Sequence, residues 1–104
     1  MQTAKVGVNK QIQIVVKTGK VAFGLKEAMD AARFAKAKLL ILASNLPTVE
    51  RESITQYAKQ SQIPIYNYPG TSVDLGAACA KPFTVAALIV NEPGDSEILK
   101  LAAG

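Results

Sequence analysis

The stretch "FTVAALIV" (residues 83–90) is the strongest strand signal in the chain. Phe, Thr, Val and Ile favour strands, and a short, nearly continuous apolar run is typical of a strand buried on both faces. A second buried strand is predicted at "KLLILAS" (38–44). Strands buried on both faces lie between two layers of helices. These two segments therefore predict an α/β fold.

Helix and strand patterns alternate outward from these two segments. Shorter strands are predicted at "KVAFG" (20–24) and "IPIYNY" (63–68). The first apolar pattern, near Val8, fits a helix better than the alternation of "IQIVV" fits a strand. Apolar spacing and capping residues predict helices from about residue 8, over 25–36, over 50–61, within 70–80 and over 93–102, the last capped by Asp95 or Ser96. We expect one domain over residues 1–104, an α/β/α sandwich in three layers with a four-stranded mixed sheet.

Composition removes several classes of function. Among the 104 residues there is one cysteine, Cys79, and no histidine, which excludes internal disulfides, Cys-His nucleophiles and Ser-His-Asp triads. No catalytic residue, metal site or cofactor is predicted, and Cys79 among alanines is expected to pack in the core. The start "MQTAKVGVNK" lacks the apolar stretch of a secretory signal, and no apolar run is long enough for a bilayer. We expect a soluble, cytoplasmic protein with no membrane partner.

Positive charge is concentrated in the first third of the chain. Residues 1–38 hold eight Lys or Arg against two Asp or Glu, a surplus of +6, whereas residues 39–104 hold four against six. Such asymmetry indicates a surface that faces a polyanion, although scattered solvated lysines produce the same count.

Two glycine-rich turns raise the question of phosphate binding. In "TGKVAFGLKE" (18–27), Gly19 and Gly24 have the spacing of a P-loop, but Leu25 occupies the lysine position and no Ser or Thr follows Lys26. "PGTSVDLG" (69–76) offers backbone donors at a helix start, but a turn at Gly70 with a Thr71 or Ser72 cap explains it more simply. A nucleotide-binding enzyme is thus a minor alternative.

Polar and aromatic residues follow the predicted strands. Asn45 ends a buried strand, where it either forms a turn or hydrogen-bonds a base. Phe83, next to Lys81 and Pro82, either begins the core of its strand or stacks on a nucleobase. Loops at strand ends share one edge of an α/β sheet, so Gly24, Asn45, residues 69–72 and residues 81–83 are expected to form one rim.

Several segments together resemble a known family. "KTGKVAFGLKE", "AKLLILASNLP", "YAKQSQIPIYNYPGTSVDLGAACAKPFTVAALIV" and "EPGDSEIL" resemble, in order and spacing, the archaeal and eukaryal large-subunit ribosomal protein thirty-e family. That family belongs with the seven-Ae group of proteins that bind kink-turns, which are helix-bulge-helix RNA elements with sheared G·A pairs and a sharp bend.

The resemblance implies a fold, a function and a set of RNA-binding residues. It implies a three-layer sandwich, a non-enzymatic structural role in the ribosome beside neighbouring ribosomal proteins, and a monomer when free of RNA. The implied RNA contacts are Gly24, Leu25, Lys26, Glu27 and Asn45, with Phe83 and Val85 packing on splayed nucleotides. Further phosphate contacts are expected from Lys20, Lys36, Arg51 and Lys81, although Glu50 beside Arg51 departs from the basic residue of some relatives.

Two further alternatives remain open from the sequence. A free-standing kink-turn protein of guide-RNA particles would carry the same loops. A domain that only bridges proteins would show no salt-dependent affinity for RNA.

Overall fold

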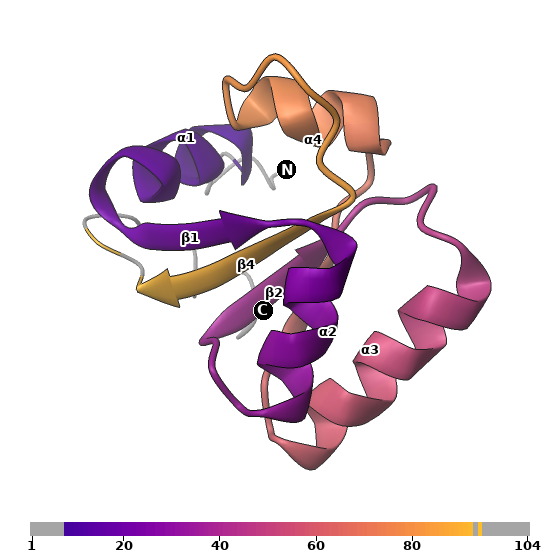
Figure 1. Cartoon of the computed structure of the whole chain (residues 1–104). Coiled ribbons are helices and arrows are strands. Elements are labelled where there is room, and N and C mark those ends of the chain that lie inside the picture. The colour runs from indigo at the N-terminus through magenta and orange to yellow at the C-terminus, as the bar shows by residue number, and fades with distance from the viewer. Residues whose placement is uncertain (1–7, 93, 95–104) are drawn as a thin grey trace, which may run out of the picture.

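The computed structural model describes residues 8–92 and Gly94, in which helices and strands alternate (Figure 1). The helices are α1 (Val8–Thr18), α2 (Leu25–Arg33), α3 (Thr48–Gln60) and α4 (Ser72–Ala78). The strands are β1 (Lys20–Phe23), β2 (Leu39–Leu42), β3 (Ile65–Asn67) and β4 (Ala87–Glu92). The predicted alternation is confirmed over this range, and the helix predicted over 93–102 lies outside the described residues.

The four strands form one mixed sheet in the order β1-β4-β2-β3. β4 runs antiparallel to both of its neighbours, and β2 pairs with β3 in parallel. β1, β2 and β3 therefore point the same way and end at the same edge of the sheet, where β4 begins. Phe23 pairs with Leu88 at this edge, and Leu42 pairs with both Ala87 and Asn67.

Helices cover both faces of the sheet, as predicted for a three-layer sandwich. α1 and α4 cover one face, where Ile12, Val15 and Leu75 pack against Leu39, Ile41 and Leu88. α2 and α3 cover the other, where Ala28, Ala32 and Ile54 pack against Leu40, Leu42 and Ile89. All four residues of β2 are fully buried because β2 is central and covered on both faces.

The two largest differences from the predicted element boundaries are at the start of β4 and at the end of α2. β4 begins at Ala87, not at Phe83, since the Val85 N–H donates 3.0 Å to the Ser72 carbonyl and so takes no part in the sheet. α2 ends at Arg33, three residues before the predicted end. Ala35 adopts a left-handed backbone conformation with φ 53°, which turns the chain toward β2.

Candidate nucleic-acid interface

The loops at the carboxyl ends of β1, β2 and β3 meet the loop that precedes β4. Backbone hydrogen bonds join them: Gly24 N–H donates to the Ala87 carbonyl at 3.1 Å, and Ser44 N–H donates to the Gly70 carbonyl at 2.9 Å. We call this surface the rim, and it consists of residues 24–27, Asn45, residues 70–72 and residues 81–84. The expectation that these loops share one edge is confirmed.

Asn45 links two loops of the rim. Its side-chain oxygen accepts a 2.9 Å hydrogen bond from the Ser72 N–H, the first amide of α4, and its side-chain nitrogen donates to Ser72 Oγ at 3.3 Å. The residue is exposed. An amide has two N–H groups and two lone pairs, so one of each stays available to a ligand. Asn45 thus serves as a turn former and also offers hydrogen bonds to a base.

The start of α2 presents free backbone amides and one lysine. Gly24 has φ 123°, a conformation that favours glycine, and a Cβ added there would lie 2.4 Å from Glu27 Oε1. Lys26 and Glu27 are exposed, whereas Leu25 is half-buried against the core beneath α2 and α3. Gly24 is therefore required by the turn itself, in addition to the close approach of RNA expected from the sequence.

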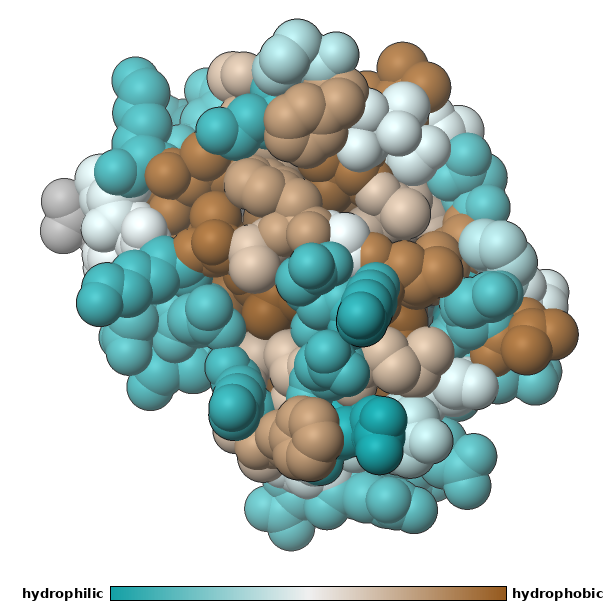
Figure 2. Space-filling view, viewed as in Figure 1, coloured by the Kyte–Doolittle hydropathy of each residue, from teal (hydrophilic) through white to brown (hydrophobic). Residues whose placement is uncertain are grey.

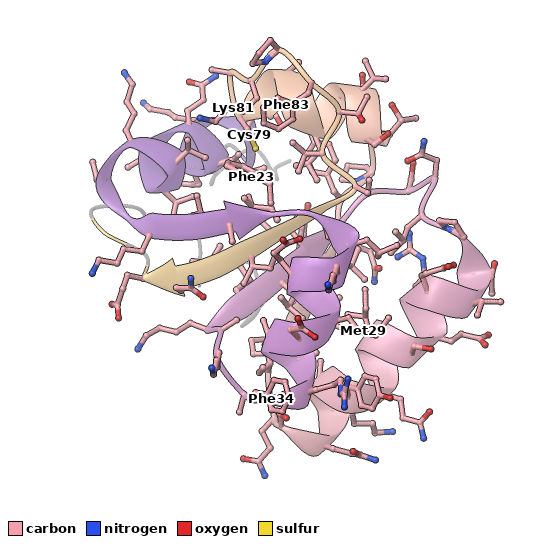
Figure 3. The ribbon with its side chains drawn as sticks, in the orientation of Figure 1. Phe23, Met29, Phe34, Cys79, Lys81 and Phe83 are labelled. Carbon is pink, nitrogen blue, oxygen red and sulfur yellow. The ribbon has the colours of Figure 1, made fainter. Side chains whose placement is uncertain are left out.

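An aromatic pair forms the apolar part of the rim. Phe83 is 52% exposed, and its ring meets the ring of Phe23 edge-on with centroids 6.1 Å apart. Lys81 Nζ lies 5.4 Å from the Phe23 centroid, so a cation adjoins the pair (Figure 3). Phe83 also lines a hollow of about 290 Å³ with Val73 of α4, which is 63% exposed. The predicted platform thus includes Val73 and rests on Phe23, two residues that sequence reasoning missed.

Val85 differs from the sequence-based expectation. Its side chain is only 1% exposed and belongs to the core between the sheet, α1 and α4. The chain turns inward after Thr84 because the Val85 N–H bonds to Ser72. Val85 therefore fixes the loop that carries Phe83, and its side chain is not available as a surface platform.

Arg51 forms hydrogen bonds to other parts of the protein. Its guanidinium donates to Asn67 Oδ1 and to the Ala43 carbonyl, which joins α3 to the ends of β2 and β3. These bonds use two of the five N–H groups of the guanidinium within the protein. The structure thus gives Arg51 a role in holding the strand ends behind Asn45.

Lys20 and Lys36 lie at the other end of the sheet from the rim. Lys20 begins β1 and pairs with Glu92, the last residue of β4. Lys36 follows α2, whose nine residues span about 13 Å from the Gly24 turn. Of the four predicted phosphate contacts, only Lys81 lies on the rim.

The second glycine-rich turn is a helix cap. Thr71 Oγ1 accepts from the Asp74 N–H while the Asp74 carboxylate accepts from the Thr71 N–H, a reciprocal capping box. Gly76 lets α4 approach the loop before β4, since an added Cβ would lie 2.3 Å from the Phe83 carbonyl oxygen. The simpler interpretation of "PGTSVDLG" is therefore supported.

Cys79 is buried, as predicted, at 1% exposure. Burial raises the pKa of its thiol to about 11, an effect that the charge of Lys81 only partly offsets. A neutral thiol is a poor nucleophile. Within residues 8–92, no helix has the length and apolar character needed to cross a membrane.

A family model and several known proteins match nearly the whole chain. The model of the "Ribosomal protein L7Ae/L30e/S12e/Gadd45 family" matches residues 7–100. A "Large ribosomal subunit protein eL30" of Methanothermobacter thermautotrophicus is 46% identical over 94 residues, which are 90% of this chain and 96% of that protein. The protein of the same name from Branchiostoma belcheri is 40% identical over 93 residues, covering 89% and 82%.

A solved structure has the same fold at low identity. "The structure of a protein with unknown function from Bacillus halodurans C" superposes with a TM-score of 0.80, at 19% identity, over 96% of this chain and all of that one. At this identity the likeness concerns the fold alone.

Proposed function

The chain belongs to the ribosomal protein L7Ae/L30e/S12e/Gadd45 family, and from this premise we propose that it is a non-enzymatic structural protein of the large ribosomal subunit that binds and stabilises a kink-turn of rRNA. Relatives that share more than 40% of its residues over nearly their whole length are named large ribosomal subunit proteins, which supports the ribosomal role and a place in the cytoplasmic ribosome. The single observation that supports kink-turn binding is that Gly24, Asn45 and Phe83 lie together on one rim.

The rim has the chemistry that an irregular RNA requires. Sequence-specific recognition of RNA takes place where bases are unstacked, through stacking on aromatic rings and hydrogen bonds to base edges. Phe83 is the exposed ring, Asn45 has a free N–H and a free lone pair, and the first turn of α2 offers amides and Lys26 to a phosphate or a base acceptor. Lys81 adds a second cation beside the aromatic pair.

The guide-RNA alternative uses the same rim chemistry. The names of the relatives favour the ribosomal assignment, and copurification with ribosomal subunits or with small RNAs would separate the two. Neighbouring ribosomal proteins are then further partners, and we expect a monomer when RNA is absent. Saturable binding of a nucleotide by the RNA-free protein would instead support the minor enzyme alternative.

The proposal is tested by titrating the protein with a fluorescent kink-turn duplex and with a duplex in which Watson–Crick pairs replace the sheared G·A pairs. We expect clearly tighter binding of the kink-turn. Lys26→Ala should weaken it, whereas Lys59→Ala, which removes an exposed lysine near the end of α3, should not. Equal affinity for the two duplexes would overturn the proposal.

A further inference from the structure

A second group of cations and an aromatic ring lies at the end of the sheet opposite the rim. We call it the distal patch, and it consists of Lys20, Arg33, Phe34, Lys36 and Lys38. All four cations are exposed, and Phe34 is 57% exposed. These cations supply half of the basic residues in positions 1–38, so much of the positive surplus found in the sequence lies away from the rim.

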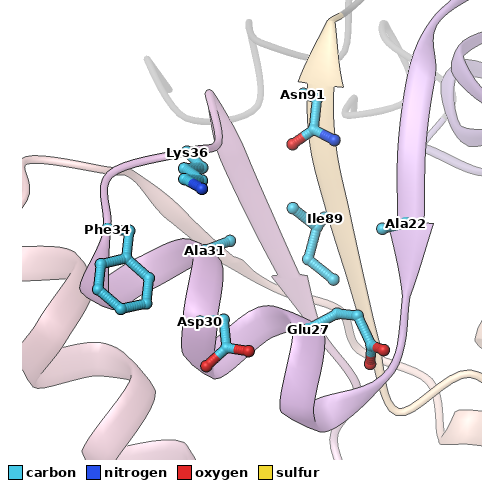
Figure 4. Close-up of a pocket in the computed structure, with 8 residues that line it drawn as sticks. All are labelled: Ala22, Glu27, Asp30, Ala31, Phe34, Lys36, Ile89 and Asn91. Atoms are coloured by element: carbon cyan, nitrogen blue, oxygen red, sulfur yellow. The ribbon is translucent and has the colours of Figure 1, made fainter.

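All members of the distal patch except Arg33 lie beside β4. The Lys38 N–H donates 2.8 Å to the Val90 carbonyl, and Lys20 pairs with Glu92. Phe34 and Lys36 line a groove of about 450 Å³ with Ile89 and Asn91 (Figure 4). Figure 2 shows apolar and hydrophilic side chains next to one another over the face of the molecule seen in Figure 1.

Two cations lie close to the Phe34 ring. Arg33 Cζ lies 5.3 Å from its centroid and Lys36 Nζ lies 5.8 Å from it, while Arg33 also lies 5.7 Å from the ring of Tyr57. Figure 3 places Phe34 at the far end of α2 from Phe83. An exposed ring flanked by cations is the arrangement that stacks on an unpaired base while neighbouring phosphates are neutralised.

The groove beside the ring contains carboxylates and a side-chain amide, in contrast to the cations around the ring. Asp30 and Glu27 line its α2 side, so the groove reaches the rim at Glu27, and Asn91 lines its β4 side. Carboxylates repel phosphates but accept hydrogen bonds from base N–H groups. This division favours an RNA strand, with its backbone along the cations and one base in the groove, over an acidic peptide, whose carboxylates would meet Asp30 and Glu27.

We propose that the distal patch binds a second RNA segment that is single-stranded or bulged, with one base stacked on Phe34 and its phosphates held by Arg33, Lys36 and Lys38. Two RNA sites at opposite ends of the sheet make the protein a bridge between two RNA segments. This second site goes beyond kink-turn binding and does not depend on it.

The test measures binding of a fluorescent single strand of about ten nucleotides, with and without saturating unlabelled kink-turn duplex. We expect binding in both conditions. Phe34→Leu, which removes the aromatic face and keeps an apolar side chain, should weaken binding about fivefold or more. Lys36→Ala and Lys38→Ala should each lower the slope of log affinity against log salt by about 0.7.

Matched controls separate this site from general attraction to a basic protein. Lys10→Ala removes an exposed cation from α1, on the other face of the sheet, and should leave binding unchanged. Phe34→Leu should leave kink-turn affinity and the melting temperature unchanged. The proposal is overturned if kink-turn duplex displaces the single strand, if Lys10→Ala weakens binding as much as Lys38→Ala, or if an oligoglutamate peptide of matched charge competes equally and Phe34→Leu has no effect.

Discussion

The side-chain oxygen of Asn45 accepts a 2.9 Å hydrogen bond from the backbone N–H of Ser72, 27 positions along the chain. This bond joins the loop after β2 to the start of α4 and sets the distance between two parts of the rim. An amide at the start of a helix has no acceptor within the helix. Asn45 therefore acts for α4 as a cap supplied by a different loop, and it also faces solvent.

Asn45 has two roles that substitutions can separate. Asn45→Ala should lower the free energy of unfolding by about 1 kcal/mol because the Ser72 N–H loses its acceptor, and it should weaken kink-turn binding. Asn45→Asp keeps an acceptor for Ser72, so stability should be retained while RNA binding falls with the loss of the N–H donor and the added negative charge. Chemical denaturation and RNA titration measure the two effects. Full RNA affinity in both variants would contradict the base-contact role.

Gly24→Ala should destabilise the protein and weaken RNA binding together. The φ of 123° costs a residue with a Cβ about 1–3 kcal/mol, and the new Cβ would meet Glu27 Oε1 at 2.4 Å. The double variant Gly24→Ala with Glu27→Ala removes the clash but not the backbone strain. It should therefore recover only part of the stability in thermal unfolding. Full recovery would show that the clash alone requires glycine here.

Phe83→Ala and Lys26→Ala should weaken kink-turn binding through different forces. Loss of the Phe83 ring should reduce affinity at every salt concentration, since stacking contributes about 1–3 kcal/mol per base. Loss of Lys26 should reduce the salt slope by about 1 if it contacts one phosphate. Both melting temperatures should stay nearly unchanged because these side chains are exposed. A large loss of stability in Phe83→Ala would instead give the ring a role in the core.

Arg51→Ala should reduce stability without changing the salt slope of RNA binding. The guanidinium donates to Asn67 Oδ1 and to the Ala43 carbonyl, and charged hydrogen bonds of this kind contribute about 1.5–3 kcal/mol. Arg51→Lys should not restore the loss, since an ammonium lacks the planar fork. An unchanged unfolding free energy with a reduced salt slope would assign Arg51 to phosphate binding.

The Cys79 thiol should be protected from alkylation in the folded protein. Its raised pKa should also lower the free energy of unfolding at high pH. Its pKa rises from 9.0 to about 11 in the folded protein. The unfolded chain therefore loses this proton first as pH rises, and the free energy of unfolding falls between pH 9 and 11. Cys79→Ala should remove this part of the pH dependence when denaturation curves of the two proteins are compared. Iodoacetamide should label the folded protein at pH 8 far more slowly than the unfolded chain; equal rates would show an accessible thiol.

Much of the fold follows from local patterns. β2 was predicted because the short apolar run in "KLLILAS" is typical of a buried strand, and all four of its residues are buried. α4 was predicted with Thr71 or Ser72 as its cap and Leu75 as a core residue; the structure has Thr71 as the cap and Leu75 buried. The predicted start of β4 was wrong because residues 83–86 have the composition of a strand. The Val85 N–H instead donates to the Ser72 carbonyl of α4, and the Ala86 carbonyl accepts from the Ala43 N–H just after β2.

The candidate site was predicted less completely. The prediction that the loops of Gly24, Asn45 and Phe83 lie together needed only the rule that the loops at strand ends share one edge of an α/β sheet. Phe23 was not expected to support Phe83, since 60 positions separate them and only the pairing of β1 with β4 brings them within 6.1 Å.

The sequence by itself determined the class of fold, the exclusion of Cys-His nucleophiles and Ser-His-Asp triads, and the loops that form the rim, because these depend on composition and on patterns within a few residues. The tertiary structure alone decided which cations join that rim. Lys26 and Lys20 are six positions apart, yet β1 carries them to opposite ends of the sheet. Only the tertiary structure shows that the Val85 side chain is buried in the core and that the Arg51 guanidinium bonds to Asn67 and to the Ala43 carbonyl. Strand direction and register are set by contacts between distant residues, which no local pattern contains.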